Sequence, residues 1–153
     1  MKLLLENFEA LLSVYDSSRF GLLISILLRS GCRVSELLAV RFRDVLFDST
    51  LIIRASKNSC DRVILIDSKY LPFLDCANSE VLIFADYDRY FVYRIFKAYG
   101  IQLKKKGRVN YSVVHSLRAC YVTKLYAAGV SKIDIAASVG LKSAKNVDYY
   151  LLS

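Results

Sequence analysis

The residues best suited to chemistry in this chain are its only histidine and an arginine three places after it. His115 and Arg118 open the stretch HSLRACYVTKLYAAG. Residues three apart on a helix share a face, so both side chains would point the same way. Arg118 could then hold a phosphate while His115 hydrogen-bonds the same group or moves a proton. Taken alone, a histidine in the core or at a helix cap is the simpler explanation.

Two further cations lie upstream. Arg33, in SGCRVSELLAV, follows a glycine stop and opens a predicted helix that begins at about Val34. A helix N-terminus favours anions, and a planar guanidinium matches two phosphate oxygens. Lys57 lies in the polar turn SKNSCD, where its ammonium could act as a general acid beside a leaving oxygen. Taken alone, Arg33 could equally be an arginine on the surface, and Lys57 could be a solvated lysine in a turn.

Two adjacent tyrosines stand near the end of the chain, in DYYLLS. On a predicted short helix, Tyr149 and Tyr150 would point about 100° apart, which allows one ring to be buried and the other exposed. A phenol is a weak nucleophile unless neighbouring groups activate it, and cations around a phosphate would do so. Because the chain holds 11 tyrosines, this pair alone indicates little.

The elements that must position these residues are mostly helices. Apolar spacing predicts helices at 4–14, 68–75, 87–99, 114–128, 131–139 and 144–150, and a buried helix in DSSRFGLLISILLRSG that stops at Gly31. TLIIRA and RVILI predict two strands joined by the polar turn. The expected fold class is α+β, mostly helical, with a small antiparallel sheet or hairpin. We expect Cys120, Val122, Leu125 and Tyr126 to anchor the 114–128 helix in the core.

Composition limits the class of protein. A chain of 153 residues fits one domain, and its net charge of +8 favours a polyanionic partner, nucleic acid first. The longest apolar run, Phe20–Leu28, is too short to cross a bilayer, so we expect a soluble intracellular protein. The cysteines form no Cys-x-x-Cys pair and no zinc site with a single histidine, and are interpreted as reduced core residues: Cys32, Cys60, Cys76 and Cys120.

A basic loop, GIQLKKKGRVNYS, lies between two of the predicted helices. Its cations could contact a phosphate backbone, and a solvated charge run explains them equally well. They are Lys104, Lys105, Lys106 and Arg108.

The order and spacing of these separate signals resemble the catalytic set of the tyrosine recombinases, the phage-integrase family. The matching residues are Arg33, Lys57, His115-x-x-Arg118 and Tyr150. Glu36 matches the acidic residue that the family often carries three places after its first arginine, and Lys57 lies where Xer-type members carry the hairpin lysine. The stretch from His115 to Ser143 resembles the family's His-x-Leu-Arg-His-x-x-Ala-x-x-Leu and Leu-Gly-His-Ser segments. The resemblance covers roughly residues 18–150 and implies a tyrosine-recombinase catalytic-domain-like fold.

The resemblance also implies a mechanism without metal or other cofactor. Tyr150 would attack a scissile phosphate and leave a 3′-phosphotyrosine and a free 5′-hydroxyl. Arg33 and Arg118 would hold the non-bridging oxygens, Lys57 would protonate the departing 5′-oxygen, and His115 would assist as base or hydrogen-bond donor. The implied partner is double-stranded DNA, bound as a tetramer in the full-length protein, whereas the isolated domain is expected to be monomeric.

The chain departs from the family's pattern in three places. Leu141 aligns with the family's second histidine and cannot donate a hydrogen bond to phosphate; Lys142, next to it, is a candidate substitute. The nucleophile normally follows that position by nine places, which selects Tyr150 over Tyr149. We expect a single catalytic domain over 1–153, apparently without the N-terminal DNA-clamp domain and C-terminal swap tail of relatives. Such a chain is either an excised domain or a minimal or decayed member.

Two other functions stay open at this point. A type IB topoisomerase uses a similar set of residues, and a non-catalytic DNA-binding relative would explain Leu141 as a sign of decay. The expected location is the cytoplasm, with association to the nucleoid when on DNA, or a host cell that carries a virus or mobile element.

Overall fold

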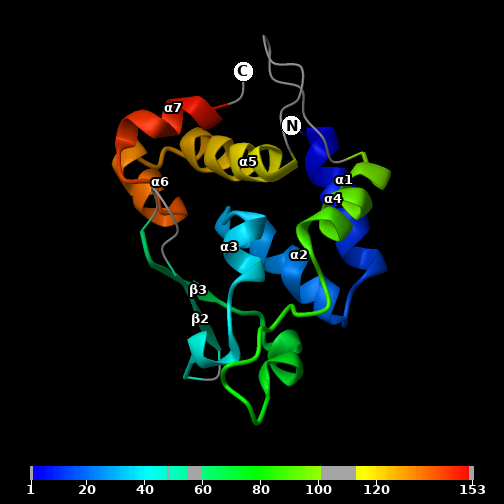
Figure 1. Cartoon of the computed structure of the whole chain (residues 1–153). Coiled ribbons are helices and arrows are strands. Elements are labelled where there is room, and N and C mark those ends of the chain that lie inside the picture. The colour runs from blue at the N-terminus through cyan, green and yellow to red at the C-terminus, as the bar shows by residue number, and fades with distance from the viewer. Residues whose placement is uncertain (1, 48, 55–59, 101–112, 152–153) are drawn as a thin grey trace.

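The computed structural model describes residues 2–47, 49–54, 60–100 and 113–151, and for residues 2–5 and 113–117 it describes the backbone alone. The α-helices are α1 (Lys2–Val14), α2 (Arg19–Ser30), α3 (Val34–Leu38), α4 (Arg89–Ala98), α5 (Val113–Ala127), α6 (Lys132–Val139) and α7 (Val147–Tyr150). The 3₁₀ helices are η1 (Phe42–Asp44), η2 (Ser68–Leu74) and η3 (Ala144–Asn146). The predicted mostly helical α+β fold is confirmed (Figure 1).

The sheet has three antiparallel strands in the order β1 (Val45–Leu46), β2 (Thr50–Ile53) and β3 (Arg62–Leu65). Thr50 lies opposite Leu65, and Ile53 lies opposite Arg62. The predicted pair of strands is thus confirmed as β2 and β3. The sequence did not predict β1, because two residues are too few to show an alternating pattern.

Local capping chemistry sets the ends of the helices around the site. The Ser18 hydroxyl accepts the N–H of Gly21 at the start of α2, and Gly31 ends that helix with a φ of 63°. The Ser131 hydroxyl caps α6 in the same way, and Gly140 ends it with a φ of 75°. A left-handed backbone suits glycine, so these residues fix where each helix stops. The chain then turns at Gly31 toward Arg33, and at Gly140 toward Leu141.

The core has two parts joined by α5. The first packs residues of α1, α2, α3, α4 and the sheet, including Phe8, Leu23 and Phe96. The second packs residues of α5, α6 and α7, including Val122 and Val139. In Figure 1, α6 and α7 gather at one end of α5, and α4 lies toward its other end; α5 contacts all three. Helix α5 therefore ties the C-terminal helices to the main core.

Some expectations about burial are wrong. Cys120 and Val122 are buried as predicted and Leu125 is half-buried, but Tyr126 is 48% exposed. Its ring lies on the surface, where the Lys132 ammonium is 5.7 Å from the ring centroid.

The four cysteines divide equally between core and surface. All are free thiols, but only Cys32 and Cys120 are buried. Cys60 and Cys76 are exposed, because they lie outside the regular elements, beside the hairpin turn and after η2. The helix predicted at 68–75 is a 3₁₀ helix that contains Pro72, whose missing N–H cannot support a regular α-helix. Within the described ranges, no helix is long and apolar enough to cross a membrane.

Candidate active site

A pocket of about 450 Å³ gathers several of the predicted site residues. Arg33 reaches it from the residue before α3, Leu141 and Lys142 from the turn after α6, and Tyr149 and Tyr150 from α7. Asn146, which the sequence did not single out, completes the lining. Segments more than 100 residues apart thus form one concave surface, as the spacing of the family motif requires.

Arg118 is fully buried and does not line this pocket, but it lies against one of the lining residues, Tyr150. Its guanidinium carbon is 5.3 Å from the centroid of the Tyr150 ring. None of its three side-chain nitrogens has a hydrogen-bond partner among the described residues, and Nε of Arg33 also lacks one. Buried polar groups are nearly always paired, and an arginine can donate five hydrogen bonds. An unpaired buried guanidinium therefore indicates a place for an anion.

The charge on Arg118 is costly in this position. Burial lowers its pKa to about 10, and the charges of Arg33 and Arg62 add to that shift, whereas the charges of the Tyr150 phenol and of Glu36 oppose it. The side chain still carries its proton at neutral pH. A cation held away from water without a partner reduces stability, and a bound anion would restore the lost interaction.

The two tyrosines of α7 occupy different environments. Tyr150 is 4% exposed, and its ring meets that of Tyr149 edge to face with 5.1 Å between centroids. The Thr123 hydroxyl lies 3.5 Å from the Tyr150 carbonyl oxygen, which links α7 to α5. Tyr149 is half-buried. The expectation that one ring would be buried is confirmed, and the buried ring is the one beside Arg118.

Glu36 holds a second arginine, Arg62, at the edge of the site. Arg62 Nη2 donates to Glu36 Oε1 at 2.8 Å, and its Nη1 donates to Oε2 at 3.1 Å. The backbone N–H of Arg33 also donates to Oε1, at 2.9 Å. Burial alone would raise the pKa of Glu36, but these hydrogen bonds and the arginine charges lower it to about 2. Glu36 is predicted from the sequence, but Arg62 is not, because its partner lies 26 residues away.

The base of the hairpin is attached to the turn after α6. The Cys60 N–H donates to the Gly140 carbonyl at 2.9 Å, and Arg62 Nη1 donates to the Cys60 carbonyl at 3.1 Å. Gly140 is followed at once by Leu141, which is 7% exposed and lines the pocket. The hairpin, the first arginine and the pocket wall are thereby fixed to one another.

Comparison with known proteins identifies the family of this chain. The model of the phage integrase family matches residues 2–153. The chain belongs to the phage integrase family. A search of curated proteins found no match.

Solved structures of tyrosine recombinases share the fold. The chain is 20% identical to XerA recombinase with a TM-score of 0.70, over 97% of this chain and 57% of that one. It is 20% identical to the catalytic domain of bacteriophage HP1 integrase with a TM-score of 0.67, over 95% and 83%. XerH recombinase bound to its difH substrate is 22% identical with a TM-score of 0.65, over 95% and 47%. This family member thus spans just over half the length of XerA.

The other predicted site residues of this family member lie outside the described residues. They are Lys57 and the loop cations Lys104, Lys105, Lys106 and Arg108. The backbone of His115 is in α5, three residues before Arg118, and its side chain is not among those described. Of the predicted catalytic set, the structure therefore brings together Arg33, Arg118 and Tyr150, with Lys142 at the same pocket.

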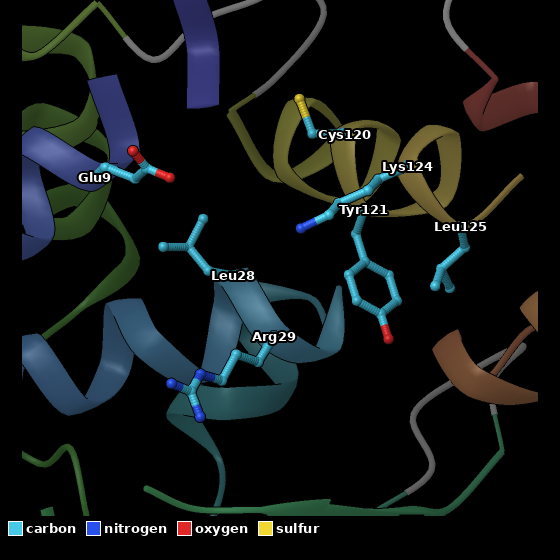
Figure 2. Close-up of a pocket in the computed structure, with 7 residues that line it drawn as sticks. All are labelled: Glu9, Leu28, Arg29, Cys120, Tyr121, Lys124 and Leu125. Atoms are coloured by element: carbon cyan, nitrogen blue, oxygen red, sulfur yellow. The ribbon is translucent and has the colours of Figure 1, made fainter. Parts of the chain in front are cut away.

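A second pocket of about 380 Å³ lies between α1, α2 and α5 (Figure 2). It too is lined by charges, Glu9, Arg29 and Lys124, together with leucines, a tyrosine and Cys120. Its cations differ from those of the first pocket: Arg29 is 59% exposed and pairs with Asp67 at 3.2 Å. Arg29 thus has both solvent and an anionic partner. The first pocket differs in that one of its lining residues, Tyr150, lies against the buried guanidinium of Arg118, which has no hydrogen-bond partner among the described residues.

Proposed function

We propose that this chain is the catalytic domain, residues 1–153, of a site-specific DNA recombinase that works through a 3′-phosphotyrosyl intermediate. Membership of the phage integrase family supports the reaction class. The observation that carries the proposal for this chain is the buried guanidinium of Arg118, unpaired among the described residues and next to the Tyr150 ring. A phosphate in the pocket would pair with that cation and lie beside the phenol.

In the proposed reaction, the Tyr150 oxygen attacks phosphorus and the bond to the 5′-oxygen of the next nucleotide breaks. The phenol loses its proton and the departing 5′-oxygen gains one. The new phosphotyrosyl bond keeps the energy of the broken one, so attack by a 5′-hydroxyl reverses the step without a nucleotide cofactor. Arg33 and Arg118 stabilise the charge that grows on the non-bridging oxygens. Cations beside the phenol also favour its developing phenolate.

The roles of two residues rest on the family resemblance. Lys57 is proposed to protonate the 5′-oxygen, and His115 to assist as base or hydrogen-bond donor. The place of His115 three residues before Arg118 on α5 supports its role, since the two share a helix face.

Leu141 leaves the site one hydrogen-bond donor short of the family's pattern. Its buried side chain lines the pocket and cannot donate. Lys142 lines the same pocket and is exposed, so its ammonium can reach toward a bound phosphate. We propose that Lys142 supplies the missing donor as a flexible point charge.

Double-stranded DNA is the proposed partner. The net charge of +8 supports a polyanion, and XerH was solved bound to a difH DNA substrate. Lys104, Lys105, Lys106 and Arg108 are proposed to contact the phosphate backbone. A tetramer on DNA for the full-length protein, and a monomer for this domain alone, stay predictions.

A suicide DNA substrate, nicked so that the cleaved fragment diffuses away, tests the proposal. The unaltered chain should form a covalent adduct, Tyr150→Phe should form none, and Tyr149→Phe should keep it. An adduct that survives Tyr150→Phe would contradict the assignment of the nucleophile. Salt-sensitive DNA binding with no adduct on any substrate would instead identify a non-catalytic relative, and relaxation of plasmid without site preference would identify a topoisomerase.

A further inference from the structure

Arg62 is a buried arginine that does not line the pocket but is bonded to residues beside it. It is 8% exposed and lies at the start of β3, where the hairpin meets the rest of the site. Both of its Nη groups are paired, with Glu36 and with the Cys60 carbonyl. A bidentate arginine–carboxylate pair fixes direction as well as distance.

We infer that Arg62 is a positioning residue, which sets the location of Arg33 and of the Leu141–Lys142 turn relative to Tyr150. This inference rests on the proposed function, because Arg33 is given its catalytic role there. Among the described residues, Arg62 neither lines the pocket nor contacts Tyr150. It therefore acts through its partners, Glu36 and the Cys60 carbonyl.

The route from Arg62 to Arg33 runs through a single carboxylate. Glu36 Oε1 accepts both the Arg62 Nη2 proton and the backbone N–H of Arg33. If Arg62 is removed, the Glu36 carboxylate loses the two hydrogen bonds that fix its direction, and the backbone N–H of Arg33 donates to an acceptor that is held less firmly. The position of the Arg33 guanidinium would change, while its charge would not.

The route from Arg62 to the other wall runs through direct packing. A Cβ placed on Gly140 would lie 2.4 Å from Arg62 Nη1 and 3.0 Å from the Cys60 carbonyl oxygen. The turn before Leu141 and Lys142 thus lies directly against the guanidinium, and only glycine leaves room for it. Any displacement of Arg62 is transmitted to two walls of the pocket at once.

The test measures single-turnover cleavage of the suicide substrate at saturating DNA, together with DNA affinity. Arg62→Met should slow cleavage about 100-fold, the effect of displacing a catalytic group by about 1 Å. Arg62→Lys, which keeps the charge but cannot pair with both oxygens, should slow it less. DNA affinity should change much less than the cleavage rate, because Arg62 is buried and the charges of Arg33 and Lys142 are kept.

Substitutions at two glycines, Gly140 and Gly129, test the same inference without changing any charge, in case Arg62→Met fails to fold. Gly140→Ala pushes directly on the Arg62 guanidinium at a φ of +75°. Gly129→Ala is its matched control, since that residue has a φ of +88° and nothing within 4 Å of an added Cβ. Both variants bear the strain of a left-handed alanine, but only Gly140→Ala should slow cleavage.

Coupling to Arg33 separates positioning from general damage. If Arg62 acts partly through Arg33, Gly140→Ala should slow cleavage by a smaller factor in an Arg33→Lys background than in the unaltered chain. If the unaltered chain is active and the factors by which Gly140→Ala and Arg33→Lys slow cleavage simply multiply, this inference alone is overturned. Equal losses of cleavage rate in Gly140→Ala and Gly129→Ala would overturn it as well. No cleavage by the unaltered chain on any suicide substrate would overturn the proposed function and this inference with it.

Discussion

Two buried arginines, in neighbouring regions of the same site, have opposite surroundings. Arg62, at the base of the hairpin, is held by both oxygens of Glu36 and by a carbonyl, with only its Nε unpaired. Arg118, in α5, is buried more deeply and has no hydrogen-bond partner among the described residues. Removing one partner of a buried ion pair costs stability, because the other charge is left uncompensated. A buried cation without a hydrogen-bond partner reduces stability, and such groups are typical of binding and catalytic sites.

The largest effect should come from Arg118. Arg118→Met removes the cation that is proposed to stabilise the transferring phosphate, so cleavage should fall at least about 100- to 1000-fold. Single-turnover cleavage of the suicide substrate measures it. Arg29→Met is the control, because Arg29 is an exposed arginine of the other pocket. An equal loss of cleavage rate in both variants would show that the two arginines do not differ in function.

Loss of the counter-ion should have the next largest effect, on stability. Glu36→Gln leaves Arg62 buried opposite a neutral group, and breaking a buried pair in this way costs about 3–5 kcal/mol of unfolding free energy. Denaturant titration measures it. Glu80→Gln is the control: Glu80 pairs with Arg43 on the surface, where both side chains are more than half exposed, and its loss should cost about 1 kcal/mol or less. Similar losses in the two variants would show that the buried pair has no special role.

The same pair predicts a dependence of stability on pH. The pKa of Glu36 is lowered from 4.5 to about 2 in the folded chain. The unfolded chain therefore takes up the proton first as pH falls, and the stabilisation present above pH 4.5 is lost as pH falls toward 2. The loss should be roughly 3 kcal/mol. Denaturant titration between pH 6 and pH 2 measures it, and Glu36→Gln should lack that part of the dependence; an identical dependence in both would contradict the assignment.

The smallest expected effect belongs to Lys142. Because its side chain is exposed, Lys142→Met should slow cleavage only about tenfold, the value of a single hydrogen bond to a charged group. Lys145→Met is the matched control, since Lys145 is exposed on η3 and does not line the pocket. An unchanged rate in Lys142→Met would mean that nothing replaces the second histidine at Leu141.

The sequence predicted features that depend on local chemistry or on the order of the motif. Ser18 and Gly31 bound α2 through contacts with residues close in the chain, and the family spacing predicted that Arg33 and Tyr150 would meet. It did not predict Arg62, because the meaning of an arginine at that position depends on a carboxylate 26 residues away. Nor did it show that Arg118 lacks a partner, since an absence of contacts can be seen only in the folded arrangement.

The measurement that tests the account most directly is a side-by-side denaturant titration of Arg118→Met and Arg62→Met without DNA. The free energy of unfolding should respond in opposite ways to the two substitutions. Arg62→Met should lose about 3–5 kcal/mol of unfolding free energy, because it removes the cation that pairs with both oxygens of the buried Glu36 carboxylate. Arg118→Met should be as stable as the unaltered chain or more stable, because it removes an unpaired buried charge. A loss in Arg118→Met as large as that in Arg62→Met would show that Arg118 supports the fold rather than an anion site, and would contradict the central claim.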